Sequence, residues 1–172
     1  MTLVEGEDSF YISKYEITDS QIEAILPEKF YIIFNRPAKT ITVDFAKKFI
    51  AALNDYTGLK YRFPTETEWE YAANGGLKSE GKTYPGSDDI DEVASYRKNT
   101  NNLRDKGSYL PNELGLYDMS GSLWELCIND TGNFILKGGS WKSSKKECQP
   151  QNNKAIEYIS FDTGLRLVLD IN

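Results

Sequence analysis

The segment from residue 62 to residue 73 reads RFPTETEWEYAA, and it is the most informative part of the chain. Thr65 and Glu68 stand three residues apart and match a capping box, in which each side chain bonds the backbone N–H of the other. Glu66 places a negative charge at the N-terminus of the helix, where the helix dipole stabilises it. Gly75 follows at the position where the helix is expected to end. The segment therefore predicts a short helix that begins after Thr65.

Two further helices are predicted on the N-terminal side of this segment. The stronger pattern runs from Thr42 to about Tyr56, where apolar residues recur at helical spacing and Gly58 stands at the position of a C-terminal cap. A shorter helix is expected to begin after Thr18, whose hydroxyl suits an N-cap, and to run through Ile25. With the helix after Thr65, the chain has two main helices and one short one.

Short strands are predicted towards both ends of the chain. The segments 10–12 and 15–17 are rich in aromatic and β-branched residues, and segment 165–170 places alternate leucines on one face. The long segment 77–111 is polar and has no sustained period, which is typical of a functional loop or one held by its own contacts. The pattern as a whole predicts an α+β fold in a single domain over residues 1–172.

The composition excludes several classes of function. The chain has 172 residues, no histidine, two cysteines and a formal net charge of −6. Histidine-dependent nucleophiles, imidazole bases and histidine-ligated zinc or iron are therefore excluded. The acidic balance predicts no nucleic-acid partner. No signal peptide or transmembrane segment is evident, so we expect no membrane insertion and a cytoplasmic or virion-associated location, unless a leader was trimmed.

Four motifs occur in a fixed order along the chain. They are RFPTETEWEYAA at 62–73, NELGLYDMSGSLWELC at 112–127, KGGSW at 137–141 and GLRL at 164–167. In this order they resemble the formylglycine-generating-enzyme, or sulfatase-modifying-factor, family. The resemblance extends from about Phe10 to the end of the chain. It implies a C-type-lectin-like fold, with a small twisted antiparallel sheet, two main helices and long irregular loops.

The resemblance also locates the catalytic thiols of the family's oxidases. Those enzymes hold Cu(I) between two thiols, and the matching positions here are Ser143 and Cys148. A serine hydroxyl is a hard ligand that stays protonated at neutral pH, whereas Cu(I) prefers thiolates. We therefore expect no copper and interpret both positions as vestigial. A related iron-dependent activity needs three histidines, which this chain lacks.

The chain has one other cysteine, Cys127, and its relation to Cys148 stays open. The two sulfurs rebuild a two-thiol site only if the fold brings them together. The alternatives are a Cys127–Cys148 disulfide in an oxidising compartment and two packed thiols in a reducing one.

A calcium site is the second feature that the resemblance implies. Family members often bind a structural calcium ion through two side chains and two backbone carbonyls, and the matching residues are Asp118, Gly121, Leu123 and Glu125. Calcium takes six to eight hard oxygen ligands, and the two acidic side chains supply charge. The alternative is that Asp118 caps a turn and Glu125 faces water.

A ligand-binding surface is predicted from the polar and aromatic residues of two segments. Tyrosine beside asparagine, serine and arginine is typical of adaptable recognition surfaces, although an ordinary polar surface has a similar composition. The candidate residues are Tyr96, Arg97 and Tyr109 in the long loop, and Trp141, Lys142, Ser143, Gln151 and Asn153 in the C-terminal segment.

Two hypotheses about function follow. The first is a non-catalytic binding or structural module that presents its C-terminal loop surface to a protein or glycan, as a display protein on a virion or cell surface or as part of an oligomer. The alternative is a divergent oxidase of the formylglycine-generating type that uses Cys148 with Cys127.

Overall fold

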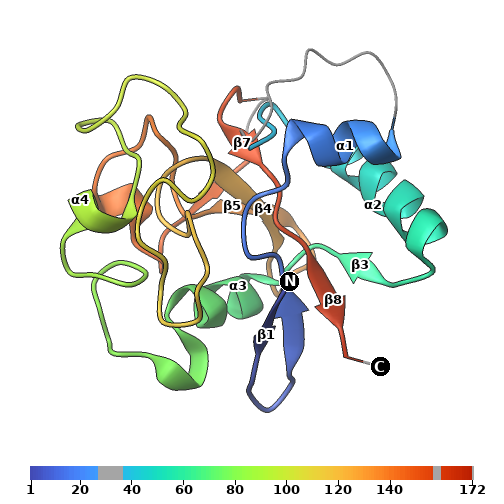
Figure 1. Cartoon of the computed structure of the whole chain (residues 1–172), viewed down its shortest axis with the longest axis horizontal. Coiled ribbons are helices and arrows are strands. Elements are labelled where there is room, and N and C mark those ends of the chain that lie inside the picture. Colours follow the sequence, from blue (N-terminus) through green and yellow to red (C-terminus); the bar gives the residue numbers. More distant parts are fainter. Residues whose placement is uncertain (27–36, 157–159, 172) are drawn as a thin grey trace.

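Over residues 1–26, 37–156 and 160–171, which this computed structural model describes, the chain forms two four-stranded sheets with helices packed around them (Figure 1). The predicted α+β class is confirmed. The strands form two sheets, whereas the sequence predicts a single small antiparallel sheet. The C-terminal segment links the two sheets, because its last strands belong to different ones.

The first sheet brings together distant parts of the sequence. Its strands are β1 (Thr2–Val4), β2 (Phe10–Ile12), β3 (Tyr61–Arg62) and β8 (Val168–Asp170). They lie in the order β1, β2, β8, β3, and all neighbours are antiparallel. The strand β8 is therefore central and pairs with β2 on one side and β3 on the other.

The second sheet contains both antiparallel and parallel pairs. Its strands are β4 (Trp124–Ile128), β5 (Phe134–Lys137), β6 (Asn153–Ala155) and β7 (Thr163–Gly164). They lie in the order β6, β5, β4, β7, and β7 runs parallel to β4. The strands β6 and β7 are consecutive in the sequence but lie at opposite edges of this sheet.

The predicted helices are confirmed together with their caps. They are α1 (Asp19–Ile25), α2 (Val43–Thr57) and α3 (Glu66–Ala73). Thr18, Thr42 and Thr65 each cap a helix through the side-chain oxygen, and Thr65 and Glu68 form the predicted capping box. Gly58 ends α2 in the left-handed conformation, with φ of 69°. Local sequence therefore defines these ends.

Two of the strand predictions are wrong. Segment 15–17 belongs to neither sheet: Ile17 N donates to Leu165 O at 2.7 Å, and the chain then turns into α1. Segment 165–170 is not one strand with a single buried face. Its residues 165–168 are all buried, because the chain passes through the interior between β7 and β8. Full burial removes the alternation on which the prediction depended.

The core consists of apolar clusters that separate the two cysteines. The largest cluster includes Phe49 and lies where α1 and α2 cover the second sheet. Cys127 belongs to a second cluster with α3, and Cys148 belongs to a smaller one beneath the long loop. That loop, residues 77–111, is largely irregular as predicted, with a 3-10 turn η1 (Gly76–Lys78) at its start and a short helix α4 (Ile90–Val93). None of the helices in the described ranges is long and apolar enough to cross a membrane.

Candidate ligand-binding site

A hollow of about 500 Å³ lies over the position of the family's first thiol. Ser143 lies in its wall, is 4% exposed, and its Oγ accepts from Ser140 N at 3.0 Å. Ser140 Oγ donates to Asp162 Oδ2 at 2.6 Å, and Asp162 also accepts from Ser160. The position is thus held by a hydroxyl–carboxylate network.

Several elements contribute to the wall of this hollow. Trp124 comes from β4, Lys154 from β6, and Glu147 from the 3-10 turn η2 (Lys146–Cys148). Phe161 stands at the rim and is 71% exposed, an unusual position for a phenylalanine. The remaining lining residues are Ser140, Lys142, Ser143, Ser160 and Asp162. The hollow therefore combines an aromatic ring, both signs of charge and hydroxyl groups.

Neither cysteine is available for thiol chemistry. Both are free and fully buried, so the alternative of a Cys127–Cys148 disulfide is not formed. Cys148 lies tightly under Gly139, where an added Cβ would come 2.8 Å from its sulfur. Burial raises the pKa of the Cys148 thiol to about 12 and the pKa of the Cys127 thiol well above its usual range. The thiolate, which is both nucleophile and metal ligand, is therefore strongly disfavoured at neutral pH.

Part of the predicted ligand surface gathers around the hollow. Lys142 and Ser143 line it, and Arg97 lies next to it because Arg97 N donates to Ser143 O at 3.1 Å. Trp141 is half-buried, and its ring lies 4.8 Å from the Lys142 ammonium. Of the predicted surface residues, Lys142 and Ser143 therefore share the lining of the hollow with Phe161, and Arg97 and Trp141 are their neighbours.

The other predicted residues lie elsewhere. Tyr96 is 2% exposed in the cluster beneath the long loop, and Tyr109 is half-buried in that loop. Asn153 Nδ2 donates to Glu66 Oε1 at 2.7 Å, so its side chain is directed towards α3. Gln151 is exposed and contacts Gln149. These four residues are not among those that line the hollow.

Sequence reasoning missed seven of the nine residues that line the hollow. They are Trp124, Ser140, Glu147, Lys154, Ser160, Phe161 and Asp162. A signal was available for two of them, because Trp124 and Ser140 stand inside the motifs at 112–127 and 137–141. Lys154 and Glu147 enter the wall through the pairing of β6 with β5 and the fold of η2, and residues 160–162 enter it where the chain joins β7 beside β4.

The four residues of the predicted calcium site lie in a buried polar region instead of a loop open to water. Asp118 Oδ2 accepts from Gly107 N at 2.7 Å, and Leu123 N donates to Glu16 Oε1 at 3.0 Å. Gly121 N donates to Gly138 O at 2.8 Å. Burial raises the pKa of Asp118 to about 6, and the pKa of Glu16 is raised well above its usual range by burial and by two neighbouring carboxylates.

Protein donors already surround the carboxylate of Glu125. Its carboxylate accepts from Arg166 Nε at 2.9 and 3.0 Å, from Arg166 Nη2 at 2.7 Å and from Trp69 Nε1 at 2.6 Å. The guanidinium of Arg166 therefore already neutralises the negative charge of the Glu125 carboxylate. Over the described ranges, no set of three or more acidic, cysteine or histidine side chains is arranged to hold a metal ion. The predicted calcium site, with two acidic side chains and two backbone carbonyls, is a different kind of set and stays a prediction.

Comparison with known proteins agrees with the motif pattern. Residues 3–171 match the family described as "Sulfatase-modifying factor enzyme 1-like domain". The chaperone protein LppX of Paenibacillus barcinonensis is 40% identical, over 63% of this chain and 49% of its own length. The formylglycine-generating enzyme of Streptomyces coelicolor is 37% identical, over 38% of this chain and 25% of its own length. The bovine "inactive C-alpha-formylglycine-generating enzyme 2" is 34% identical, over 46% of this chain and 32% of its own length.

The fold is also found in solved structures. Treponema denticola variable protein 1 superimposes with a TM-score of 0.82 over 99% of this chain and 92% of its own, at 18% identity. This likeness confirms the predicted C-type-lectin-like fold. The chain spans about half or less of the length of the curated relatives named above. Because the family match covers almost every residue, the chain belongs to the sulfatase-modifying factor enzyme 1-like domain family.

Proposed function

We propose that this domain is a non-catalytic binding module that holds a protein or glycan ligand at the hollow around Ser143. The observation that carries the proposal is the replacement of the first thiol by Ser143, whose hydroxyl is part of a hydrogen-bonded network with Ser140 and Asp162. Without two thiolates, the Cu(I) chemistry of the family's oxidases has no ligand set.

The state of the second thiol supports the same proposal. Cys148 is fully buried, with a pKa raised by that burial to about 12, and Cys127 belongs to a different apolar cluster. The divergent oxidase would need both sulfurs ionised and adjacent. The name of one relative, an inactive formylglycine-generating enzyme, fits a family in which the scaffold is used without oxidation.

The chemistry of the hollow suits a polar ligand with an apolar face. Phe161 supplies an exposed ring, Lys142 an exposed cation, and Asp162 a carboxylate held by two serines. An aromatic surface beside a small number of fixed polar groups is the usual composition of sites for proteins and sugars. One structural neighbour is named a variable protein, and presentation of this loop surface on a virion or cell is the form of use that we propose.

The proposal can be tested with glycan and peptide arrays. The native domain, Lys142→Ala, Phe161→Ala and the matched control Lys48→Ala, which changes an exposed lysine on α2, are applied in parallel. We expect the native domain and the control to bind the same array component, and each variant at the hollow to bind at least about tenfold more weakly, which is about 1.4 kcal/mol. Equal binding by all four proteins would refute the site. Formylglycine formed in a cysteine-containing peptide by the copper-treated domain would refute the non-catalytic assignment.

A further inference from the structure

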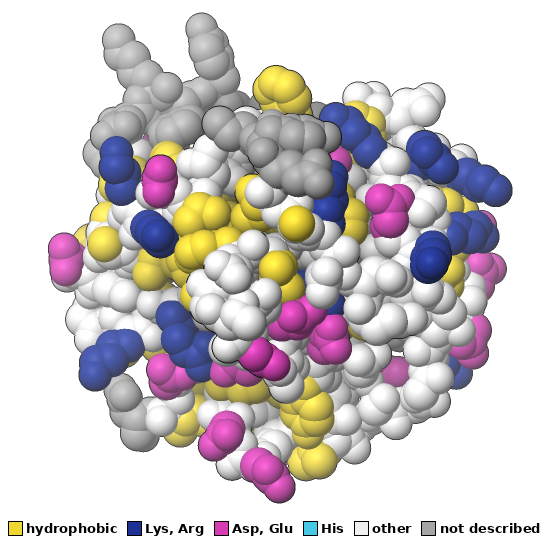
Figure 2. All heavy atoms as spheres, turned by 180° about the vertical axis from the view of Figure 1, so that it is seen from behind, with side chains coloured by type: hydrophobic (Ala, Val, Ile, Leu, Met, Phe, Trp, Pro, Cys, Tyr) yellow, Lys and Arg dark blue, Asp and Glu magenta, His cyan; other side chains and the backbone are white. Residues whose placement is uncertain are grey.

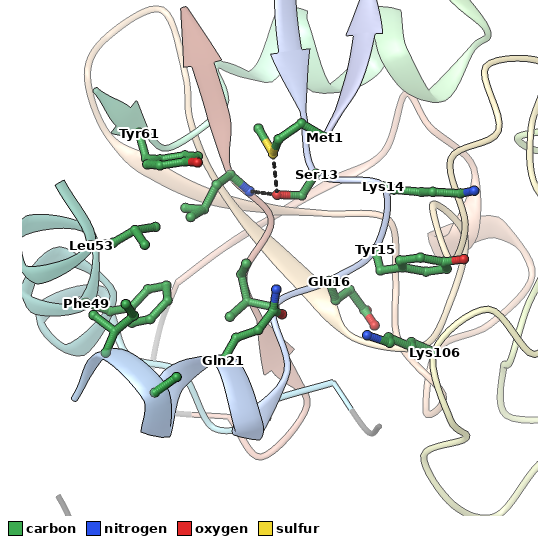
Figure 3. A pocket seen from close by; sticks show the side chains of 14 residues that line it. Met1, Ser13, Lys14, Tyr15, Glu16, Gln21, Phe49, Leu53, Tyr61 and Lys106 are labelled. Atoms are coloured by element: carbon green, nitrogen blue, oxygen red, sulfur yellow. Dashed lines mark hydrogen bonds between the residues drawn. The ribbon is translucent and has the colours of Figure 1, made fainter. Parts of the chain in front are cut away.

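We propose that a second hollow, between α1, α2 and the segment 13–17, binds a small amphipathic carboxylate. This hollow has a volume of about 500 Å³ and shares no lining residue with the hollow around Ser143 (Figure 3). It has the size of a small-molecule site. Its two ends differ in chemistry, and this difference defines the class of ligand.

One end of the hollow is apolar and reaches into the core. Phe49 and Leu53 extend from α2, and Figure 3 shows them on the same side as Tyr61. Ile17 and Leu167 also line the hollow, although both are core residues that are 6% and 1% exposed. Burying an alkyl chain against these side chains stabilises a complex by roughly 0.8 kcal/mol per CH₂ group.

The wall is held in place by the protein's own contacts. Thr18 and Thr42 cap the helices that form two of its sides. Asn54 fixes Tyr61 by a pair of hydrogen bonds, Asn54 Nδ2 to Tyr61 O at 3.0 Å and Tyr61 N to Asn54 Oδ1 at 2.8 Å. A site that is formed in advance loses less free energy on ordering when a ligand binds.

The other end of the hollow is positively charged. Lys106 Nζ lies 5.3 Å and Lys14 Nζ 5.7 Å from the centre of the Tyr15 ring, and Figure 3 shows both lysines on the side of the hollow opposite Phe49 and Leu53. Neither lysine forms an ion pair with any residue in the described ranges. Each ammonium is therefore available to an anionic group.

The acidic residue of the lining does not cancel this charge. Glu16 is 1% exposed, and its carboxylate accepts from Ser122 Oγ at 2.9 Å and from Leu123 N at 3.0 Å. Its oxygens are thus directed towards the buried polar region. A ligand with an apolar body and a single carboxylate matches both ends: the body contacts Phe49 and Leu53, and the carboxylate contacts Lys106.

The test uses octanoate and its uncharged analogue 1-octanol as probes. Titration into the native domain is followed by two-dimensional NMR, and we expect octanoate to shift the amide signals of Ala24 and Leu53 while that of Lys142 stays in place. Lys106→Gln should weaken octanoate binding about tenfold and leave 1-octanol binding within about twofold, because only the first loses a charge contact.

Two matched substitutions on the helices test the location. Ala24→Trp fills the hollow from α1 and should abolish binding of both probes, whereas Ala51→Trp, on an exposed position of α2 outside the hollow, should leave binding unchanged. Thermal melts identify any variant that fails to fold. For such a variant, the octanoate-induced amide shifts of the native domain are used to accept or reject the proposed site. Absence of shifts at Ala24 and Leu53 up to millimolar octanoate, or equal loss of both probes in Lys106→Gln, would overturn the proposal.

Discussion

Replacing Arg166 by leucine should be among the most destabilising single changes in this domain. The side chain is fully buried, and it donates to Ser13 O at 2.8 Å and to Tyr117 O at 2.9 Å, in addition to its three contacts with Glu125. Glu16 and Asp118 are also close enough to affect the pKa of the guanidinium. The substitution would leave buried carboxylates without their cation.

The expected loss follows from this geometry. Removing one partner of a buried ion pair costs about 3–5 kcal/mol, because the other charge stays buried and unpaired. The two carbonyls that lose a donor add about 1 kcal/mol each. A total of at least about 5 kcal/mol corresponds to a fall of roughly 10–20 °C in Tm for a domain of this size.

Urea unfolding, followed by circular dichroism at neutral pH, measures this loss. A matched control is Arg62→Leu, since Arg62 also contacts two carboxylates, Glu68 and Asp170, but its side chain is 35% exposed. That change should cost only about 1 kcal/mol. The double variant Arg166→Leu/Glu125→Gln should be more stable than Arg166→Leu, because it removes the unpaired charge and keeps an acceptor for Trp69. A loss below about 1 kcal/mol in Arg166→Leu, or a double variant no more stable than the single one, would refute the reasoning.

Three further outcomes are expected. Burial raises the folded-state pKa of Asp118 from its ordinary value of about 4 to about 6, so the native chain loses stability as the pH rises between these two values and by no further amount above them. Asp118→Asn should therefore gain stability relative to the native chain as the pH rises from about 4 to 7, and a constant difference would contradict this. The thiols of Cys127 and Cys148 should react with a disulfide reagent at pH 8 only after unfolding, because both are buried, and rapid reaction of the native chain would show that one is accessible. A calcium chelator should leave Tm unchanged, since Arg166 occupies the carboxylate of Glu125; a midpoint that rises with calcium concentration would show that the ion binds.

The helices could be predicted because their signals are local. Thr42 and Gly58 mark the two ends of α2 within the sequence that forms it, and Thr65 and Glu68 do the same for the start of α3. Capping depends on side chains within a few residues of each helix end. The order of the four motifs, in turn, predicts the C-type-lectin-like fold.

The buried ion pair and the second sheet could not be predicted in this way. Arg166 meets Glu125 across 41 residues and Ser13 across 153, and no local pattern encodes those pairings. The alternate leucines at 165 and 167 predicted one buried face, whereas Arg166 between them is buried as well. Ser143 could be identified from its motif, whereas Phe161 and Lys154 join it only through the tertiary fold.

The central position of β8 has a consequence for synthesis of the chain. The ribosome releases β1, β2 and β3 early, but β2 and β3 do not pair with each other, and each requires β8 as its neighbour. In the second sheet, β4 likewise lacks one of its two neighbours until β7 has been synthesised. Neither sheet can therefore close until residues 163–170 have emerged, and the high sequence separation of these contacts predicts slow folding after translation instead of stepwise folding during it. Until then β2 and β3 have unpaired edges, and a chaperone that holds the nascent chain would act in this interval.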